Sequence, residues 1–170
     1  MTRIRFGNFQ QNTPSHMQPT YVSASVFVRV ENKQLITIET RRRQQPTHSD
    51  YMLCFGARRL HTEHDSWHTA LRELARKLGV EPIELTDLHP TSKFEVPQIQ
   101  SNEIQVFYVL DITQAQASNY LASKNRNQLQ HCEKIKVLPL NTRLEAAPLF
   151  GFHRYVLKQA LARQHLVLVK

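Results

Sequence analysis

The sequence predicts an α/β fold, in which helices cover a mixed β-sheet. Three features support it: an alternating apolar hairpin over residues 22–40, an amphipathic helix that ends at Gly79, and an apolar strand over residues 104–112. The 170 residues have the length of one domain with a sizeable core. We therefore expect an N-terminal extension over residues 1–20 and a single domain over residues 21–170.

The first elements of the domain read as two paired strands. Apolar and other residues alternate over residues 22–30, and residues 35–40 follow a turn at residues 31–33. This spacing is typical of a β-hairpin. The polar residues 41–50 predict a loop.

One side of the next helix is apolar, at spacings of three and four residues: Trp67, Ala70, Leu71, Leu74 and Leu78. Asp65 or Ser66 can cap its start, and Gly79 can end it in the left-handed conformation.

The other side of this helix is charged and carries His68, Arg72, Glu73, Arg76 and Lys77. Glu73 lies three and four residues before Arg76 and Lys77, so the pattern favours a solvated, salt-bridged face worth about 0.3–0.5 kcal/mol per pair. Reversing the charges of Arg76 and Lys77 is then expected to leave the melting temperature nearly unchanged.

The remaining elements are predicted from runs of apolar residues and from the proline and polar residues that separate them. We expect short strands over residues 83–88 and 92–95, a central strand over 104–112, a helix over 113–123, a loop over 125–131, an edge strand over 133–140 and a last helix over 152–164.

The chain is strongly basic. Lys and Arg number 22 against 14 Asp and Glu, which gives a formal net charge of +8 and a pI near 9.8. Such a balance is compatible with nucleic acid or another polyanion as a partner. The cations are scattered along the sequence, so only folding could gather them into a patch.

Cysteine use and hydropathy indicate a reducing, cytoplasmic setting. Cys54 and Cys132 are far apart and lack metal-ligand spacing. The polar N-terminal residues lack the apolar core of a secretion signal, and no apolar stretch approaches the roughly 20 residues needed to cross a bilayer. We expect no membrane association.

Residues 56–80, GARRLHTEHDSWHTALRELARKLGV, resemble a Nudix box. The family pattern is G-x5-E-x7-R-E-U-x-E-E-x-G-U, where U is a bulky aliphatic residue. Residues 72–80 fit its second half at seven places, and the exceptions are the acidic pair, where this chain has Arg76 and Lys77. The replacement changes the charge of one helical turn by four units.

The first half of the box fits with one inserted residue. Gly56 then stands at the first glycine of the pattern, Glu63 at the first glutamate, and eight residues separate Glu63 from Arg72. Residues 51–55 are similar to the aromatic lead-in of the family. The likeness extends over roughly residues 21–140, and it implies a Nudix-like α/β/α sandwich with a mixed β-sheet.

The resemblance also implies a chemistry, which the altered box opposes. Nudix hydrolases cleave nucleoside diphosphates linked to another moiety, with a divalent metal ion held by the box carboxylates. Magnesium demands oxygen ligands, whereas Arg76 and Lys77 offer only donors. We therefore expect an inactive metal site, no catalytic residues and no cofactor.

The favoured function is a module that binds a nucleotide, polyphosphate or RNA, or a regulatory module. The cations expected to hold phosphate are Arg58, Arg59, Arg72, Arg76 and Lys77. Two alternatives stay open. One is an active Nudix-type pyrophosphohydrolase with rearranged ligands that include Glu63 and Glu73 and take Mg or Mn; the other is a subunit that binds a protein partner.

Other chemistries have weaker support. His61, His64 and His68 could ligate zinc, but they show no closed four-ligand pattern, and an exposed loop is favoured. Neither cysteine has a nucleophile motif, and the chain has no Gly-rich phosphate loop. Aromatic residues could stack on a base, although in strands they are more often core; they are Tyr51, Phe94, Phe107 and Tyr108.

Overall fold

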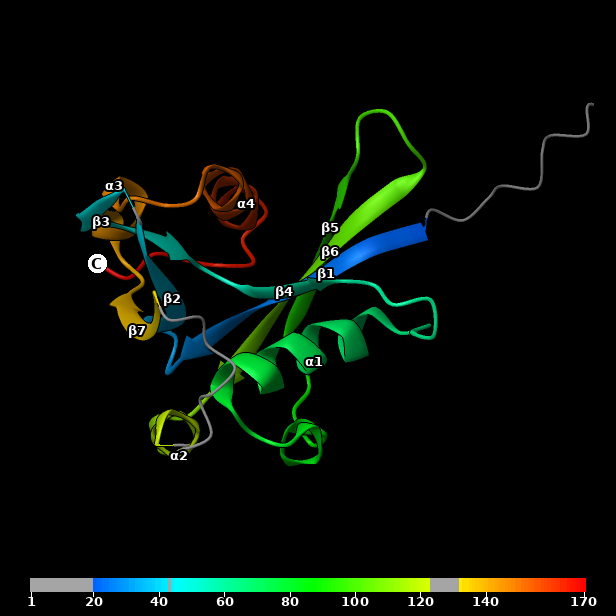
Figure 1. Ribbon diagram of the computed structural model, residues 1–170, viewed down its shortest axis with the longest axis horizontal. Helices are drawn as coiled ribbons and strands as arrows, with labels where there is room; N and C mark the ends of the chain where they lie inside the picture. Colours follow the sequence, from blue (N-terminus) through cyan, green and yellow to red (C-terminus); the bar gives the residue numbers. More distant parts are fainter. Residues whose placement is uncertain (1–19, 43, 123–131) are drawn as a thin grey trace, which may run out of the picture.

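The computed structural model describes residues 20–42, 44–122 and 132–170, which are arranged around a curled, mixed β-sheet (Figure 1). The predicted loop over 125–131 lies outside the described residues, as does all but the last residue of the predicted N-terminal extension. None of the described helices is long and apolar enough to span a membrane.

The sheet has the strand order β3-β2-β1-β6-β5, while β4 pairs with β1 and β7 pairs with β2. β1 and β6 are parallel, and the other pairs are antiparallel. The strands are β1 (Thr20–Val30), β2 (Gln34–Arg42), β3 (Gln45–Met52), β4 (Phe55–Arg58), β5 (Ser92–Pro97), β6 (Glu103–Ile112) and β7 (Glu133–Pro139).

Helices cover the two faces of the sheet, and the alternation of strand side chains explains why. Val26 and Val28 of β1 pack into the cluster that contains the apolar side of α1, whereas Phe27 packs into the cluster that contains α4. The helices are α1 (Ser66–Leu78), the 3-10 helix η1 (Pro82–Leu85), α2 (Gln114–Leu121), α3 (Thr142–Ala146) and α4 (Gly151–Ala162). The predicted α/β/α sandwich is confirmed.

Two predicted elements are wrong. The expected loop over 41–50 is mostly strand β3, because β2 continues to Arg42 and supplies a partner for its backbone. The expected strand over 83–88 begins instead with η1, where Glu81 and Glu84 form a capping box around Pro82. The short elements β4 and α3 were not predicted.

The boundaries of α1 follow its sequence signals. The Asp65 side chain accepts a hydrogen bond from the backbone N–H of Trp67, and Gly79 ends the helix with a φ of 68°. Because a left-handed residue is strained unless it is glycine, this end of the helix is fixed by sequence.

The charged side of α1 is only in part the solvated face that the sequence indicated. His68 and Arg76 are exposed, and Arg76 pairs with Glu73 as predicted. Lys77 is 4% exposed and Glu73 8% exposed. Nζ of Lys77 lies 2.6 Å from Oε2 of Glu133, at the start of β7, and both side chains are buried. The physical reason is that Glu133 lies against this side of the helix and supplies a counter-charge away from water. The premise that Lys77 is exposed, on which the expectation of an unchanged melting temperature rested, is therefore wrong.

We expect Lys77→Met to lower the free energy of unfolding by about 3–5 kcal/mol, because the buried Glu133 carboxylate would lose the ammonium group 2.6 Å away. Urea denaturation measures the change. The double variant Lys77→Met/Glu133→Leu should recover most of the loss, since it leaves no unpaired charge.

Lys93→Met is the matched control for this experiment. The Lys93–Glu95 pair is 3.8 Å apart and about half exposed, so its loss should change the free energy of unfolding by less than about 1 kcal/mol. Equal losses in the two single lysine variants would contradict a stabilising buried pair.

Candidate functional site

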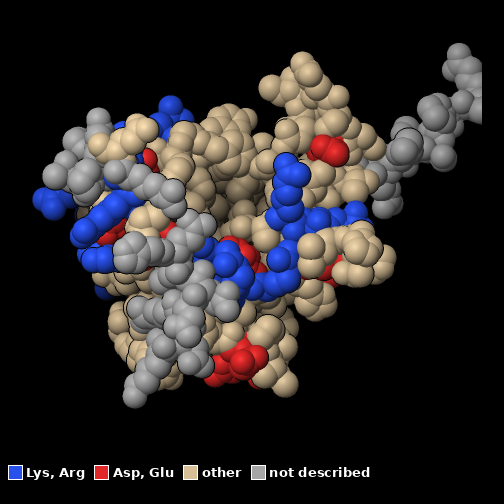
Figure 2. Space-filling model, in the orientation of Figure 1, with Lys and Arg blue, Asp and Glu red and all other residues tan. Residues whose placement is uncertain are grey.

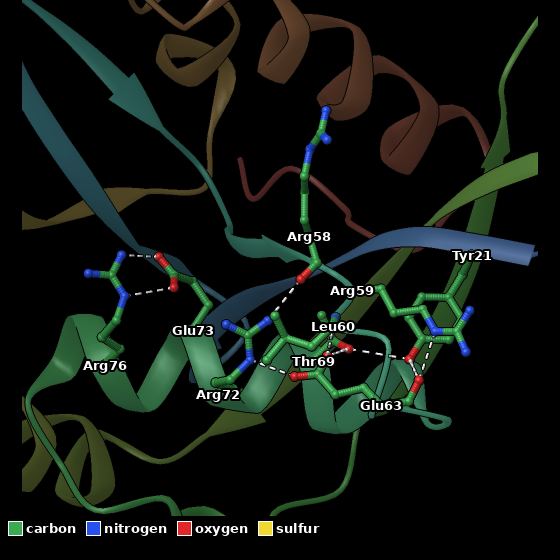
Figure 3. A network of polar contacts seen from close by, with 9 residues as sticks. All are labelled: Tyr21, Arg58, Arg59, Leu60, Glu63, Thr69, Arg72, Glu73 and Arg76. Atoms are coloured by element: carbon green, nitrogen blue, oxygen red, sulfur yellow. Dashed lines mark hydrogen bonds and ion pairs between the residues drawn. The ribbon is translucent and has the colours of Figure 1, made fainter.

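The loop between β4 and α1 is organised by the carboxylate of Glu63 (Figure 3). Its Oε1 accepts a hydrogen bond of 2.6 Å from Nε of Arg72, and its Oε2 accepts hydrogen bonds from Thr69 and from the backbone N–H of Leu60. Burial alone would raise the pKa of Glu63, but the bonds from Thr69 and Arg72 lower it overall. Glu63 is therefore held as a carboxylate with both oxygens engaged.

Arg72 and Arg59 fasten this loop to its neighbours. Arg72 donates through Nη2 to the carbonyl oxygen of Arg58 at 2.8 Å, in addition to its bond to Glu63. Arg59 donates to the carbonyl oxygen of Glu63 at 2.7 Å, and its guanidinium lies 4.9 Å from the ring centroid of Tyr21. Both arginines therefore hold the loop in place.

The second carboxylate of the box region, Glu73, is also bound to an arginine. Arg76 donates from Nη2 to Oε1 of Glu73 at 2.6 Å and from Nε to Oε2 at 2.9 Å, a bidentate pair (Figure 3). The hydrogen bonds that Arg76 donates to Glu73, together with the negative charges of Glu73 and Glu133, raise the pKa of Arg76. With Lys77 these residues form a cluster of two cations and two anions.

These carboxylates do not fit the metal ion that a Nudix box implies. A divalent cation would have to displace Arg72 from Glu63 and Arg76 from Glu73. The Nudix pattern would supply further oxygen ligands from an acidic pair, but this chain has Arg76 and Lys77 at those positions. Among the described residues, no group of three or more His, Cys, Asp and Glu side chains is arranged to hold a metal.

The three histidines considered for zinc belong to no metal-holding group among the described residues. His61 and His64 are exposed on the loop, and Nδ1 of His68 lies 3.7 Å from Oδ2 of Asp65 at the exposed start of α1.

A groove lies on the side of β4 away from α1. It consists of a pocket of about 600 Å³ and a neighbouring pocket of about 220 Å³, and Ser23 and Arg58 line both. The larger pocket also contains Arg59, His61 and Glu103. A hollow bordered by basic surface is visible in the space-filling view (Figure 2).

Arg58 is placed to meet a ligand in this groove. Its exposed side chain points away from α1 toward α4 (Figure 3), and α4 contributes Phe152 and His153 to the smaller pocket. Within the described part of the chain, nothing bonds to its guanidinium. Arg58 therefore differs from Arg59, whose guanidinium already has partners.

The floor of the smaller pocket requires a glycine. Gly56 of β4 pairs with Ser25 of β1, and a Cβ built on Gly56 would lie 1.9 Å from Oγ and 2.9 Å from Cβ of Ser25. The two strands can approach this closely only because Gly56 has no side chain.

Cys54 and His153 meet in this pocket but do not form a nucleophile pair. Sγ of Cys54 lies 3.7 Å from Nδ1 of His153, and that nitrogen accepts a hydrogen bond from the backbone N–H of Leu53. Burial raises the pKa of the Cys54 thiol to about 12 and lowers that of His153 to about 4. At neutral pH both groups are uncharged, whereas a thiolate is the nucleophile that such chemistry requires.

No protein-family model and no curated protein matches this sequence. Among solved structures, the chain is similar to a mutT/nudix family protein from Listeria innocua, with a TM-score of 0.53 and 16% identity over 86% of this chain and 96% of that one. The chain has the Nudix fold.

Two further solved structures are similar at low identity. One is a bifunctional NMN adenylyltransferase/ADP ribose pyrophosphatase from Francisella tularensis, complexed with AMP and a Mn ion (TM-score 0.51, 13% identity, 88% of this chain and 43% of that one). The other is NrtR from Shewanella oneidensis, complexed with a 27mer DNA (TM-score 0.50, 18% identity, 84% and 61%).

Within this Nudix fold, the five cations selected from the sequence do not form one cluster. Arg58 and Arg59 line the larger pocket, Arg72 binds the loop, Arg76 pairs with Glu73, and Lys77 is buried against β7. Sequence reasoning missed the contribution of α4 to the smaller pocket. No local motif marks that contribution, because α4 lies about a hundred residues from β4 along the chain.

The buried imidazole predicts a pH dependence of stability. Its folded pKa of about 4 lies below the ordinary value of 6.5, so the unfolded chain binds the proton more readily. The stabilising contribution of neutral His153 is complete above pH 6.5 and is lost as the pH falls through about 4. About 2 kcal/mol should be lost between pH 7 and pH 5.

His153→Asn tests this dependence, since an amide oxygen can replace Nδ1 as the acceptor for the backbone N–H of Leu53. Urea denaturation at both pH values should show a smaller decline for the variant than for the wild type. Equal declines would place the pH sensitivity in other groups.

Proposed function

We propose that this Nudix-fold protein binds the phosphate groups of a nucleotide, a polyphosphate or RNA without hydrolysing them. One observation carries the proposal. Glu63 and Glu73 are each bound by an arginine, while the guanidinium of Arg58 lines the groove on the other side of β4 and bonds to none of the described residues.

The loss of hydrolysis follows from the charges of the box. Hydrolysis in this fold family uses a metal ion to polarise phosphate and activate water. The bidentate bond between Arg76 and Glu73 and the bonds from Arg72 and Thr69 to Glu63 would all have to break to admit the ion. Breaking buried or partly buried pairs leaves unpaired charge, which disfavours the metal-bound state.

The binding of phosphate follows from the position of Arg58. A guanidinium offers a planar set of donors that matches phosphate oxygens, and Arg59 adds a second positive charge in the larger pocket. Glu103 lines the same pocket and opposes an anion there. Phosphate is therefore better placed near Arg58, where the two pockets meet.

Structures of similar fold support nucleotides and nucleic acids as the first ligands to test. The Francisella tularensis enzyme was solved with AMP and a Mn ion, and Shewanella oneidensis NrtR with DNA. Their sequences are less than 20% identical to this one, so binding measurements have to identify the ligand of this chain.

We expect no release of phosphate or monophosphate from nucleoside triphosphates, dinucleotides or nucleoside diphosphate sugars, with or without Mg or Mn. A colorimetric phosphate assay and chromatography of the nucleotides measure turnover. Metal-dependent turnover that disappears in Glu63→Gln and in Glu73→Gln would instead establish the active hydrolase with rearranged ligands.

We expect Arg58→Ala to weaken binding of inorganic polyphosphate about tenfold, because one exposed charge-assisted contact to phosphate is lost. Isothermal titration calorimetry at several NaCl concentrations should also show affinity falling with salt. Arg143→Ala, at an exposed arginine of α3, is the control and should bind like the wild type. Equal binding by all three proteins would remove Arg58 from the site and favour a protein partner.

A further inference from the structure

Two aromatic side chains of α4 lie on the surface beside the groove. Phe152 is 47% exposed and Tyr155 is 49% exposed. They are three residues apart on the helix, hence on one side of it, and their ring centroids are 6.3 Å apart. Contiguous exposed apolar surface of this kind marks a candidate binding site.

The rings continue inward to the sheet. Phe107 of β6 is buried, and its ring centroid lies 6.3 Å from that of Phe152. Phe107 and Phe152 both line the smaller pocket. We name the rings of Phe107, Phe152 and Tyr155 the aromatic track, which runs from the floor of the pocket to the outer surface of α4.

The smaller pocket has the size and polarity for one nucleobase. Its volume of about 220 Å³ lies below the roughly 300 Å³ at which sites for drug-sized ligands begin. Ser23 and Ser25 contribute hydroxyl groups, and His153 can donate through Nε2 because its Nδ1 accepts from Leu53. These groups can hydrogen-bond the edge of a base that lies against a ring.

Charge favours a polyanion over an apolar peptide on this surface. Arg58 lines the pocket, and none of the described residues that line it carries a carboxylate. The whole chain has a formal net charge of +8. Proteins that bind single-stranded nucleic acid combine cations, which contact the phosphates, with exposed rings on which the bases stack.

We propose that the aromatic track binds unpaired bases of a single-stranded nucleic acid whose backbone passes Arg58. The inference rests on the proposed function and names its ligand class. A duplex is excluded by the same geometry, because paired bases are stacked inside the helix and cannot reach Phe152 or the pocket.

The test measures binding of fluorescein-labelled 12-nucleotide probes by fluorescence anisotropy. The probes are oligo(U), oligo(dT), an abasic deoxyribose phosphate oligomer of the same length, and a 12-base-pair duplex. We expect oligo(U) or oligo(dT) to bind at least tenfold more tightly than the abasic oligomer and the duplex. The two single-stranded arms distinguish RNA from DNA as the preferred source of the bases.

Variants of the aromatic track then test whether its rings contact the bases. Phe152→Ala and Tyr155→Ala should each weaken binding of the preferred single strand about tenfold, while Phe152→Trp, which keeps a ring, should retain it. Both side chains are about half exposed and lie outside the buried core, so the alanine variants should keep the fold. Ile83→Ala removes an apolar side chain that is 77% exposed on η1, and it should bind like the wild type.

The outcomes separate this inference from the proposed function. Binding of polyphosphate that depends on Arg58, together with unchanged binding of single strands in Phe152→Ala and Tyr155→Ala, would overturn the aromatic track and leave phosphate binding in place. Equal affinity for the single strand, the abasic oligomer and the duplex would overturn it as well. Failure of polyphosphate and all four probes to bind would overturn both.

Discussion

The two hydrogen bonds by which Arg72 joins α1 to the preceding loop and to β4 set the geometry of the residues around them. Arg72 holds Glu63 with one nitrogen and the carbonyl oxygen of Arg58 with another, so a single guanidinium fixes the helix, the loop and the end of the strand. The carbonyl oxygen of Arg58 is held by Arg72 of α1, while its side chain extends toward α4 (Figure 3). The residue that gives the groove its cation is thus anchored through its backbone to α1.

Charge inversion in the box is balanced within the fold. Where the Nudix pattern has two carboxylates, this chain has the cations Arg76 and Lys77. They form ion pairs with Glu73 and Glu133, respectively. The second of these anions comes from β7, more than fifty residues later. The two adjacent cations of this helical turn are therefore neutralised by two carboxylates in the folded protein. The bond between Lys77 and Glu133 also attaches α1 to the edge strand β7.

The sequence predicts the fold well and the site only in part, for physical reasons. The hairpin, α1 with its Asp65 and Gly79 ends, and the apolar strand β6 all depend on local periodicity and capping, which are visible in a short window. The burial of Lys77 depends on a partner in β7, and the aromatic track depends on how α4 crosses the sheet. Neither depends on a local pattern, so charge and spacing alone misplace Lys77 on a solvated face.

The close approach of β1 and β4 has an evolutionary consequence. Replacing Ser25 by alanine would not make room at Gly56, since the Cβ atoms alone would be 2.9 Å apart, so the strands would have to separate before position 56 could vary. Gly79 is held by its positive φ, and Arg72 by its bonds to the loop. Gly56, Arg72 and Gly79 of the box-like segment are therefore each needed by the fold itself. Positions 76 and 77, where the Nudix pattern has carboxylates, are under no such backbone constraint, and here they carry cations that pair with Glu73 and Glu133.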